Sequence, residues 1–590
     1  MATPVIEAQR LYVYQNDTDV ARTVIATASD ATGVESVTNN VGYWSAASTF
    51  TSIFVPSSGA STVEGVCSRD WMYFVDGLNS DCQKWDLDYG VQIWGIVAPL
   101  SSELMTISDH YTGVINLNIG RVYYYAYYNS VTGNYSDLSQ PSPSSGPVVN
   151  KELQLTNIYP SSDPQVTGMV LLATADGGDP SILYFVATLA ADATNYLDNT
   201  TETDLLLAPV YQETDTSGLT SGLLGNEPPP ASGKFPTKWN GRLWLVQDQF
   251  LRFSKSLAEV ITSTGVIAGR YEEDWPSYNS IDVSEGAETI HGLLAGGSTL
   301  YVGTELHIRS MTGNDATTFS QPVIVFNDVG LLNQPVWQTV FLEGTPVGAM
   351  WLTPDLRCIG SDFNTYQDVG TPIQSTLNSI NPAALNNCWA QFTSNGPYNF
   401  YILAIPTGAN TVPDTLCVYD LHGHKWYIWQ LYDQLSAGLF YLSYTGIPRF
   451  MFTDASGDIW AFDTTTTWDR NLDVTATGIT TILTTSFLDL GDPTIHKTLN
   501  EVEVGTSLSG MLVSVSGASM PSSYGSPNTV LSPTALSVSP FGQYKVYLNG
   551  APATDRMYQF SFSATSDNNS TTSDIFLDLF STQVKPLHRY

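Results

Sequence analysis

Pairs of apolar strands recur along this chain about every 50 residues, and this repeat constrains the fold more than any other feature of the sequence. Each unit holds an apolar strand, a polar turn rich in Asp, Gly or Asn, and a second strand. A period of about 40 to 50 residues is typical of one four-stranded blade of a β-propeller. Because each blade buries its faces only against its neighbours, the ring has to close. The units are centred near Trp71, Leu243, Leu300, Met350, Tyr401 and Met451.

The local pattern within these units is that of strands. Segments such as Arg121–Tyr128, Gly241–Val246 and Asn399–Ile405 are dominated by β-branched and aromatic residues, and helical spacing is almost absent. Only short helices are expected, for example around Thr376–Leu385. The sequence therefore predicts an all-β protein with a propeller of six or seven blades, in which residues 1–102 close the ring beside the later blades.

Two segments depart from the repeat. Residues 103–215 contain about seven short strands, the length of an immunoglobulin-like sandwich, and resemble a fibronectin type III module inserted into the propeller. The three prolines in Glu227–Gly233 make that stretch a stiff exit linker. Residues 471–590 alternate without the unit and predict a C-terminal β-sandwich or strands at the propeller rim. The predicted domains are thus 1–102, 103–215, 216–470 and 471–590, the first and third being the two parts of the propeller.

The charge balance argues against a nucleic-acid grip. The chain has 22 Lys and Arg against 56 Asp and Glu, a net charge of −34, although charged residues are only 13% of the total. Phosphate binding needs clustered cations, so the chain is expected to repel DNA. An alternative interpretation is that the acidity keeps a crowded β-protein soluble.

Cysteine usage and hydropathy give expectations about the compartment. The cysteines form no CxxC pair, so free buried thiols are expected, as in a reducing cytoplasm. The start of the sequence does not have the pattern of a signal peptide, and no run of 18 apolar residues occurs. We therefore expect assembly inside a cell, with no membrane insertion by this chain. The cysteines are Cys67, Cys82, Cys358, Cys388 and Cys417.

Sequence motifs of catalysis and cofactor binding are absent. The chain has no GxSxG, HExxH, GxGxxG or phosphate-binding loop. His422 and His424 flank Gly423 and would point to one face of a strand, which could begin a metal site. Two ligands do not make a site, and a polar hairpin turn is the favoured interpretation. We expect no catalytic, cofactor-binding or metal residues, and no enzyme activity.

Two further patterns are weighed and set aside. Glu272, Glu273, Asp274 and Asp282 lie close in sequence and could supply paired carboxylates for glycoside hydrolysis, but a solvated loop surface is the favoured interpretation. The turn Asp454–Trp460 is similar to the Asp box of sialidase propellers, with a spacing one residue too long. A glycine-containing hairpin loop is the simpler interpretation.

Several segments taken in order resemble the propeller-bearing nozzle or hub proteins of short-tailed bacteriophage tails. They are DWMYFVDGLNSDCQKWD, WGIVAP, RVYYYAYYNSVTGNYSDLSQPSP, NGRLWLVQDQFLRFS, RYEEDW, GLLAGGSTLYVGTELHIRSMTG, TLCVYDLHGHKWYIW and SFLDLGDPTIHKTLNEVEV. The resemblance is one of fold-level patterns and covers most of the chain.

The resemblance implies a non-catalytic virion protein of the tail, assembled in the host cytoplasm. Six copies would form a homo-oligomeric ring around the DNA exit channel, in contact with an adaptor and with fibres or spikes. Genomic DNA would pass without specific binding. For such a ring, the net charge of −34 predicts a lumen lined by Asp, Glu and small polar residues, with Lys and Arg biased to subunit contacts and the outer face. No cofactor is implied. Two other functions stay open: a propeller that binds a carbohydrate or receptor, and a polysaccharide hydrolase.

Overall fold

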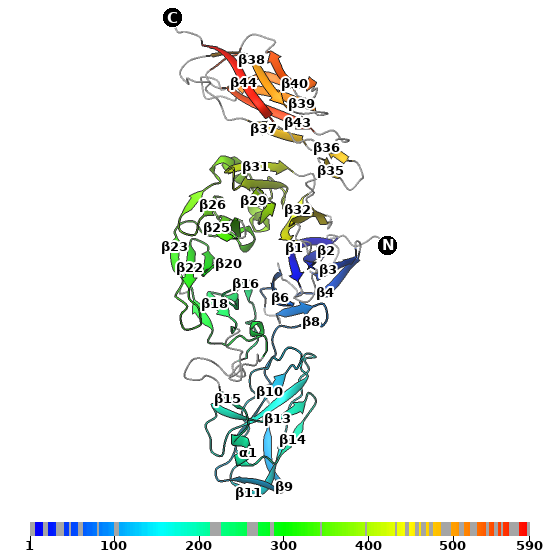
Figure 1. Ribbon diagram of the computed structural model, residues 1–590, viewed down its shortest axis with the longest axis vertical. Helices are drawn as coiled ribbons and strands as arrows, with labels where there is room; N and C mark the ends of the chain where they lie inside the picture. Colours follow the sequence, from blue (N-terminus) through cyan, green and yellow to red (C-terminus); the bar gives the residue numbers. More distant parts are fainter. Residues whose placement is uncertain are drawn as a thin grey trace. The chain divides into compact units, whose positions relative to one another are not determined.

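Antiparallel β-sheets make up almost all of the regular secondary structure of the computed structural model (Figure 1), and the chain forms two compact units, Met1–Ala461 and Phe462–Tyr590. None of the helices among the described residues is long and apolar enough to cross a membrane. The structure describes residues 6–15, 22–30, 40–46, 49–56, 63–78, 82–99, 105–212, 226–256, 269–283, 288–342, 345–395, 398–430, 434–442, 448–454, 459–461, 468–470, 476–478, 480–484, 497–506, 512–519, 528–537, 542–547, 553–555, 558–565 and 577–586.

Seven sheets of consecutive antiparallel strands form the blades of a propeller. Blades 1 to 3 are β1–β4 (Ile6–Gln15, Arg22–Asp30, Asn40–Ala46, Thr49–Phe54), β5–β8 (Glu64–Ser68, Trp71–Val75, Gln83–Asp86, Gly90–Ile93) and β16–β19 (Lys234–Trp239, Arg242–Gln247, Phe250–Phe253, Ser280–Asp282). Blades 4 to 7 are β20–β23 (Ile290–Gly296, Thr299–Thr304, Ile308–Thr312, Val323–Phe326), β24–β27 (Gln338–Leu342, Thr345–Leu352, Cys358–Ser361, Tyr366–Asp368), β28–β31 (Trp389–Asn395, Tyr398–Ile405, Thr415–Asp420, Lys425–Gln430) and β32–β34 (Leu435–Leu442, Pro448–Asp454, Ile459–Ala461).

The ring closes through the first strand of each blade. Each first strand contacts the first strand of the next blade, and β1 contacts both β5 and β32. Each described sheet of the ring is built from consecutive strands, so closure depends on packing between blades 1 and 7. The N-terminal strand β1 thus lies between the first strands of blades 2 and 7.

The second strand of each blade explains the repeat seen in the sequence. All six predicted unit centres fall on such a strand, namely β6, β17, β21, β25, β29 and β33. In β6, all five residues of Trp71–Val75 are buried, because both faces of the strand pack against other strands. Blade 1 was not recognised, since its second strand, Arg22–Asp30, is rich in Thr and Ala and lacks an apolar run.

Short helices interrupt the strands at few places. The helix expected around Thr376–Leu385 is divided between α2 (Gln374–Leu377) and a 3-10 segment, η5 (Pro382–Asn387). Further 3-10 turns are η2 (Tyr271–Glu273), η3 (Gln334–Val336) and η4 (Thr371–Ile373).

A two-sheet sandwich lies in the sequence between blades 2 and 3. One sheet has the order β10-β12-β13-β15, the other β14-β11-β9, and side chains of both sheets form one shared core. We call it the insert. Its expected ends, Glu103 and Asp215, lie outside the described residues. The elements are β9 (Thr106–Leu117), β10 (Tyr123–Tyr128), β11 (Val148–Thr156), β12 (Gly168–Ala173), β13 (Ile182–Ala190), β14 (Asn195–Asp198), α1 (Glu202–Leu206) and β15 (Val210–Gln212).

A serine repeat covers the free edge of β10. Four serines spaced three residues apart each donate a backbone N–H to a carbonyl in or next to β10. Each serine hydroxyl also accepts a hydrogen bond from the backbone N–H of the residue whose carbonyl that serine contacts. Ser139 Oγ, for example, lies 3.0 Å from Tyr125 N. A period of three residues is that of a polyproline II helix, which suits this Pro- and Ser-rich stretch. The pairs are Ser136–Tyr127, Ser139–Tyr125, Ser142–Tyr123 and Ser145–Arg121.

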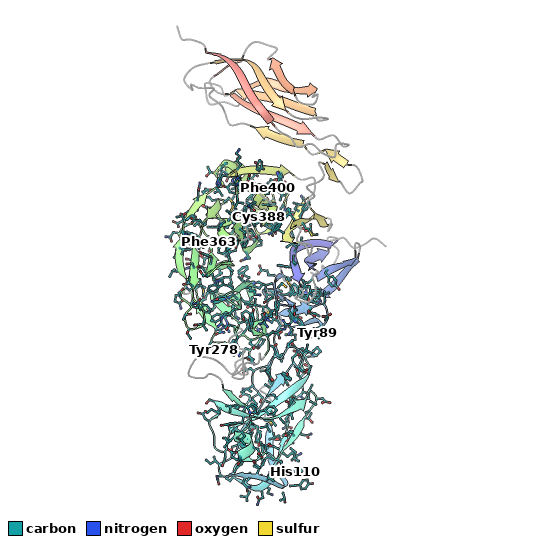
Figure 2. The ribbon with its side chains drawn as sticks, viewed as in Figure 1. Tyr89, His110, Tyr278, Phe363, Cys388 and Phe400 are labelled. Atoms are coloured by element: carbon teal, nitrogen blue, oxygen red, sulfur yellow. The ribbon has the colours of Figure 1, made fainter. Side chains whose placement is uncertain are left out.

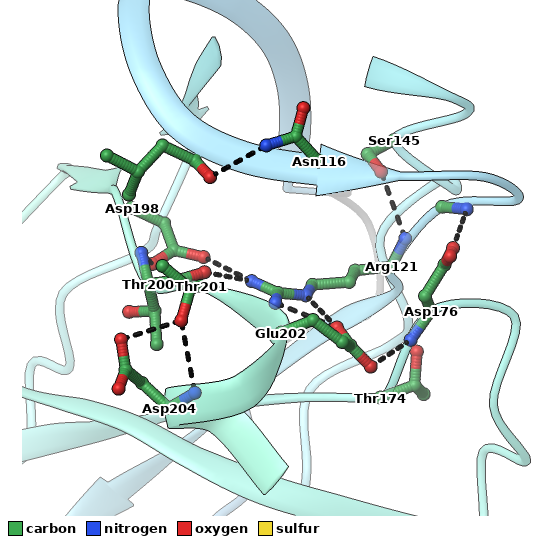
Figure 3. A network of polar contacts seen from close by, with 12 residues as sticks. Asn116, Arg121, Ser145, Thr174, Asp176, Asp198, Thr200, Thr201, Glu202 and Asp204 are labelled. Carbon is green, nitrogen blue, oxygen red and sulfur yellow. Dashed lines mark hydrogen bonds and ion pairs between the residues drawn. The ribbon is translucent and has the colours of Figure 1, made fainter. Parts of the chain in front are cut away.

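Arg121, fully buried beside β10, holds the end of β14 and the start of α1 together (Figure 3). Its Nη1 lies 3.3 Å from Asp198 Oδ2 and donates to Thr200 O at 2.8 Å, while Nη2 lies 2.9 Å from Glu202 Oε2. The hydroxyl of Tyr123 donates to the same Asp198 oxygen at 2.6 Å. Removing the guanidinium would leave Asp198 as a buried, unpaired carboxylate, a loss of about 3–5 kcal/mol.

The second compact unit contains two further sheets and a separate strand pair. The sheets are β37-β43-β39-β40 and a group in which β38 pairs with β41, β42 and β44; β35 pairs with β36. The strands are β35 (Trp468–Arg470), β36 (Ala476–Gly478), β37 (Thr480–Thr484), β38 (Lys497–Thr506), β39 (Leu512–Ser519), β40 (Asn528–Ser537), β41 (Gly542–Tyr547), β42 (Ala553–Asp555), β43 (Tyr558–Thr565) and β44 (Leu577–Pro586).

All five cysteines are free, and all but Cys67 are buried. Burial raises the pKa of the Cys388 and Cys417 thiols to about 12, so both stay protonated and unreactive at neutral pH. The expectation of free thiols is confirmed.

Candidate functional site

The acidic turn Arg270–Trp275 lies inside the protein, at the junction of blade 2, blade 3 and the insert. Glu272, Glu273 and Asp274 are at most 2% exposed. The interpretation of these carboxylates as a solvated loop surface is therefore wrong. Tyr271 and Trp275, which flank them, are also buried and are the sequence signal that could have indicated it. Asp282 lies apart in β19 and is partly exposed.

Basic side chains from blade 2 pair with this turn. Lys84 Nζ in β7 lies 2.6 Å from Glu273 Oε2, and both side chains are enclosed. Arg69 Nε lies 3.2 Å from Glu272 Oε1, which also accepts from Ser68 Oγ at 2.9 Å. The backbone around Arg69 has φ 51°, a left-handed conformation that a non-glycine residue rarely adopts. Because these bases belong to blade 2 and the acidic turn belongs to blade 3, the two ion pairs stabilise the packing of one blade against the other.

Burial sets the electrostatics of the cluster. Burial lowers the pKa of Lys84, although the charge of Glu273 opposes this shift. Burial raises the pKa of Glu272, although the charge of Arg69 opposes that shift. Burial also raises the pKa of Asp274 to about 7, although Lys255 opposes the shift. We call these eight residues the junction cluster, with equal numbers of bases and acids: Arg69, Lys84, Lys255, Arg270, Asp70, Glu272, Glu273 and Asp274.

Aromatic rings enclose the cluster. The indole N–H groups of Trp94 and Trp275 both donate to the carbonyl oxygen of Glu272, at 2.7 and 2.9 Å. The two indoles meet edge to face at 5.5 Å, and Tyr73 packs on Trp94 at 4.8 Å. Buried Trp N–H groups normally find such acceptors, so the rings fix the turn as well as excluding water.

The insert is attached to the same turn. Arg270 N–H donates to Asn134 Oδ1, and Asn134 Nδ2 donates to Arg270 O, both at 3.0 Å. The backbones approach so closely that a Cβ on Gly269 would lie 3.0 Å from Asn134 Cα, and Gly269 has φ +93°. A second attachment is Gln165 Nε2, which donates to Gly95 O at 2.8 Å. The cluster therefore also determines how the insert is held.

This arrangement can stabilise an interface but is poorly suited to hydrolysis. A glycosidase needs two carboxyl groups that flank a sugar bond. The side chains of Glu272 and Glu273 are sealed beneath aromatic rings, and each has one oxygen without a hydrogen-bond partner. Those oxygens are suited to internal water, which commonly satisfies buried polar groups.

A cavity of about 220 Å³ lies among the first strands of the blades. Glu64 is the one charged residue of its lining, and its Oε2 accepts from the backbone N–H of Phe235 at 2.6 Å. The rest of the lining consists of amide, aromatic and small or apolar residues. Its lining comprises Leu11, Tyr12, Glu64, Gly65, Phe235, Pro236, Gln334, Pro335, Gln338, Trp389, Ala390, Gln391, Ala437 and Gly438.

The remaining candidates from the sequence are not brought together. His424 Nδ1 lies 3.3 Å from the Tyr419 hydroxyl, and His422 is exposed in the same turn. Within the described residues, no group of three or more His, Cys, Asp or Glu side chains could hold a metal ion. Of the Asp-box-like turn, residues 455–458 lie outside the described residues.

Four basic side chains are buried in internal contacts, which the sequence did not predict. Lys84, Arg121, Arg242 and Lys255 are at most 1% exposed. These four side chains are therefore not available at the outer face or in subunit contacts, where Lys and Arg are predicted to be enriched. Each is held by an acid, a carbonyl or an amide oxygen, because a buried cation needs such partners.

Comparison with known proteins gives similarity of fold only. No protein-family model matches the chain, and no curated protein sequence matches it. Among solved structures, a virginiamycin B lyase from Staphylococcus aureus is 10% identical with a TM-score of 0.25, over 77% of this chain and 94% of that one. Kluyveromyces lactis Hsv2 is 7% identical with a TM-score of 0.24, over 72% and 98%. Both are β-propeller proteins. At these scores the similarities carry no argument about activity.

Proposed function

We propose that this chain is a non-catalytic structural protein of a bacteriophage tail, one of six identical copies in a ring around the DNA exit channel. The assignment to a tail is supported by the ordered resemblance of its segments to nozzle and hub proteins. The fibronectin type III character of the insert and contacts with an adaptor and with fibres or spikes belong to the same proposal.

The observation that favours self-association is the outer strand of blade 4. In β23 the consecutive residues Val323, Ile324 and Val325 are 59, 42 and 39% exposed. This strand ends its sheet, so one edge is unpaired. Monomeric proteins usually protect such edges with charges or cover them. Tyr427 and Ile428 in β31, the outer strand of blade 6, are exposed in the same way.

The charge distribution fits the same role. With a net charge of −34, copies of the chain repel one another at long range. An apolar contact surface therefore suits association better than a charged one. The repulsion also acts on DNA: an acidic lumen would let a duplex slide, because it offers no cations to the phosphates.

The junction cluster supports a mechanical role. A ring component must keep its modules in fixed relative positions while DNA passes. Buried ion pairs with both partners enclosed resist separation, because breaking such a pair leaves each charge without its partner and costs free energy. The bonds between Asn134 and Arg270 extend the same rigidity to the insert.

The assembly of the purified full chain tests this proposal. We expect native mass spectrometry and negative-stain microscopy to show rings for the wild type, and monomers for Ile324→Asp, which places a charge on the exposed edge. Tyr111→Asp, on a side chain that is 72% exposed in the insert, is the matched control and should assemble normally. Rings that form equally well with Ile324→Asp would contradict the role of β23.

A further inference from the structure

A second cavity, of about 140 Å³, opens where blade 2 meets the insert. It is distinct from the cavity among the first strands. No residue of its lining is charged. Its lining includes Trp71, Tyr89 and Gln92 from blade 2, and Asn129, Thr132 and Gln165 from the insert.

One wall of this cavity is aromatic. The rings of Trp71 and Tyr89 are stacked, with centroids 6.0 Å apart and planes at 10°. Trp71 is 2% exposed, whereas Tyr89 is 53% exposed (Tyr89 is labelled in Figure 2). The Tyr89 backbone is fixed, because its N–H donates to Asp86 Oδ1 at 3.1 Å, and Asp86 in turn accepts from Tyr14. The exposed ring is therefore held ready for a flat apolar partner.

The other wall consists of amides and hydroxyls. Asn129 Oδ1 accepts from the backbone N–H groups of Val131 and Thr132, at 2.9 and 3.2 Å, which fixes this loop. Gln165 uses its Nε2 on the backbone of blade 2, and its Oε1 is buried with no hydrogen-bond partner. The Oε1 of Gln92 is also buried and has no hydrogen-bond partner. Two residues of the cavity wall thus carry acceptors that lack donors.

These features select a ligand class. A lining without charged residues disfavours a charged ligand, and a wall of amides and hydroxyls favours a ligand that is rich in hydroxyls. The aromatic wall requires an apolar face on that ligand. A pyranose ring has both, with C–H groups on one face and hydroxyls at its edge. The volume is below the ~300–1,000 Å³ of pockets for drug-sized ligands, which restricts the occupant to a single ring.

We propose that the cavity between blade 2 and the insert binds one neutral pyranose unit of a glycan, stacked on Tyr89. The junction cluster also contacts this wall, since Lys84 Nζ is 4.9 Å from the Trp71 ring centroid. The proposal is independent of ring formation, which rests on β23.

The test is saturation-transfer difference NMR on the full chain with the methyl glycosides of glucose, galactose, mannose, N-acetylglucosamine and rhamnose. We expect transfer to at least one of them, and Tyr89→Ala should weaken that binding about tenfold or more, since a stacked ring contributes roughly 1 kcal/mol beyond its buried area. Tyr278→Ala is the matched control: Tyr278 is 58% exposed, lies in the segment before β19 and does not line the cavity. It should bind like the wild type.

Three outcomes would overturn the proposal. They are no transfer to any of the five glycosides, equal transfer with Tyr89→Ala, and loss of transfer with Tyr278→Ala. Circular dichroism checks the fold of each variant, and Gln92→Leu supplies a second site variant if Tyr89→Ala does not fold. Gln92→Leu removes a cavity acceptor, so it too should weaken binding; unchanged binding would count against the site. A wild-type chain that binds no glycoside but assembles into rings refutes this inference alone.

Discussion

Replacing Lys84 with methionine keeps most of the side-chain volume and removes only the charge, which isolates the contribution of the buried pair with Glu273. In the wild type the two groups lie 2.6 Å apart, and both are enclosed. The variant leaves Glu273 as a carboxylate without a partner inside the protein. Breaking a buried pair in this way costs about 3–5 kcal/mol. At roughly 2 °C per kcal/mol for a domain of this size, the melting temperature of the propeller should fall by about 6–10 °C.

The double variant Lys84→Met, Glu273→Leu separates the pair from its surroundings. Replacing both charges with apolar groups is often neutral, so the double variant should recover most of the lost stability.

Differential scanning calorimetry and urea unfolding followed by tryptophan fluorescence measure these changes. Arg357→Ala is the control, since Arg357 and Asp355 are paired at 2.6 Å but are 32 and 59% exposed, and such pairs contribute about 1 kcal/mol or less. Equal losses for Lys84→Met and Arg357→Ala would refute the reasoning, because burial would then make no difference.

Three further predictions concern other parts of the structure. The pKa of Asp274 is raised in the folded state to about 7, above its unfolded value, so its contribution to stability is complete at low pH and is lost as the pH rises toward 7. The free energy of unfolding of the wild type, relative to that of Asp274→Asn, should therefore fall by about 1 kcal/mol per pH unit within that window. Urea unfolding measures this difference, and parallel pH profiles of the two proteins would contradict the prediction. Ser139→Ala should cost about 1–3 kcal/mol because it leaves the buried Tyr125 N–H without its acceptor, whereas Ser144→Ala, at an exposed position, should cost less than 0.5 kcal/mol in the same measurement. Deleting residues 1–56 removes blade 1 and exposes the first strands of its neighbours, so the product should aggregate in size-exclusion chromatography; a soluble, cooperatively melting product would show that closure is dispensable.

The propeller could be predicted because its information is local. The second strand of a blade is buried on both faces, and such a strand is a short apolar run between turns, as in Trp71–Val75. Six of these runs were found at their correct places. Blade 1 lacks the signal, since Arg22–Asp30 alternates small residues with Thr, and its place in the ring depends on contacts with blade 7 that no local pattern encodes.

The junction cluster could not be predicted for the same physical reason. Glu272 and Glu273 resemble any acidic turn in a chain with 56 acids, and their partners Arg69 and Lys84 lie about 190 to 200 residues away. The burial of a charged residue can be inferred only when its partner is known, and a single sequence does not show which distant base pairs with which acid. The serine repeat that begins at Ser136 is different, because its spacing of three is visible in the sequence and could have indicated an extended segment along a strand edge.

Electron cryomicroscopy of phage particles purified from cells that produce this chain tests the proposed tail function most directly. The account predicts a ring of six propellers at the tail, with the β23 edge of each copy in a contact between subunits and no line of Lys or Arg facing the DNA path. A particle that lacks the chain, or a single copy placed away from the DNA path, would contradict it.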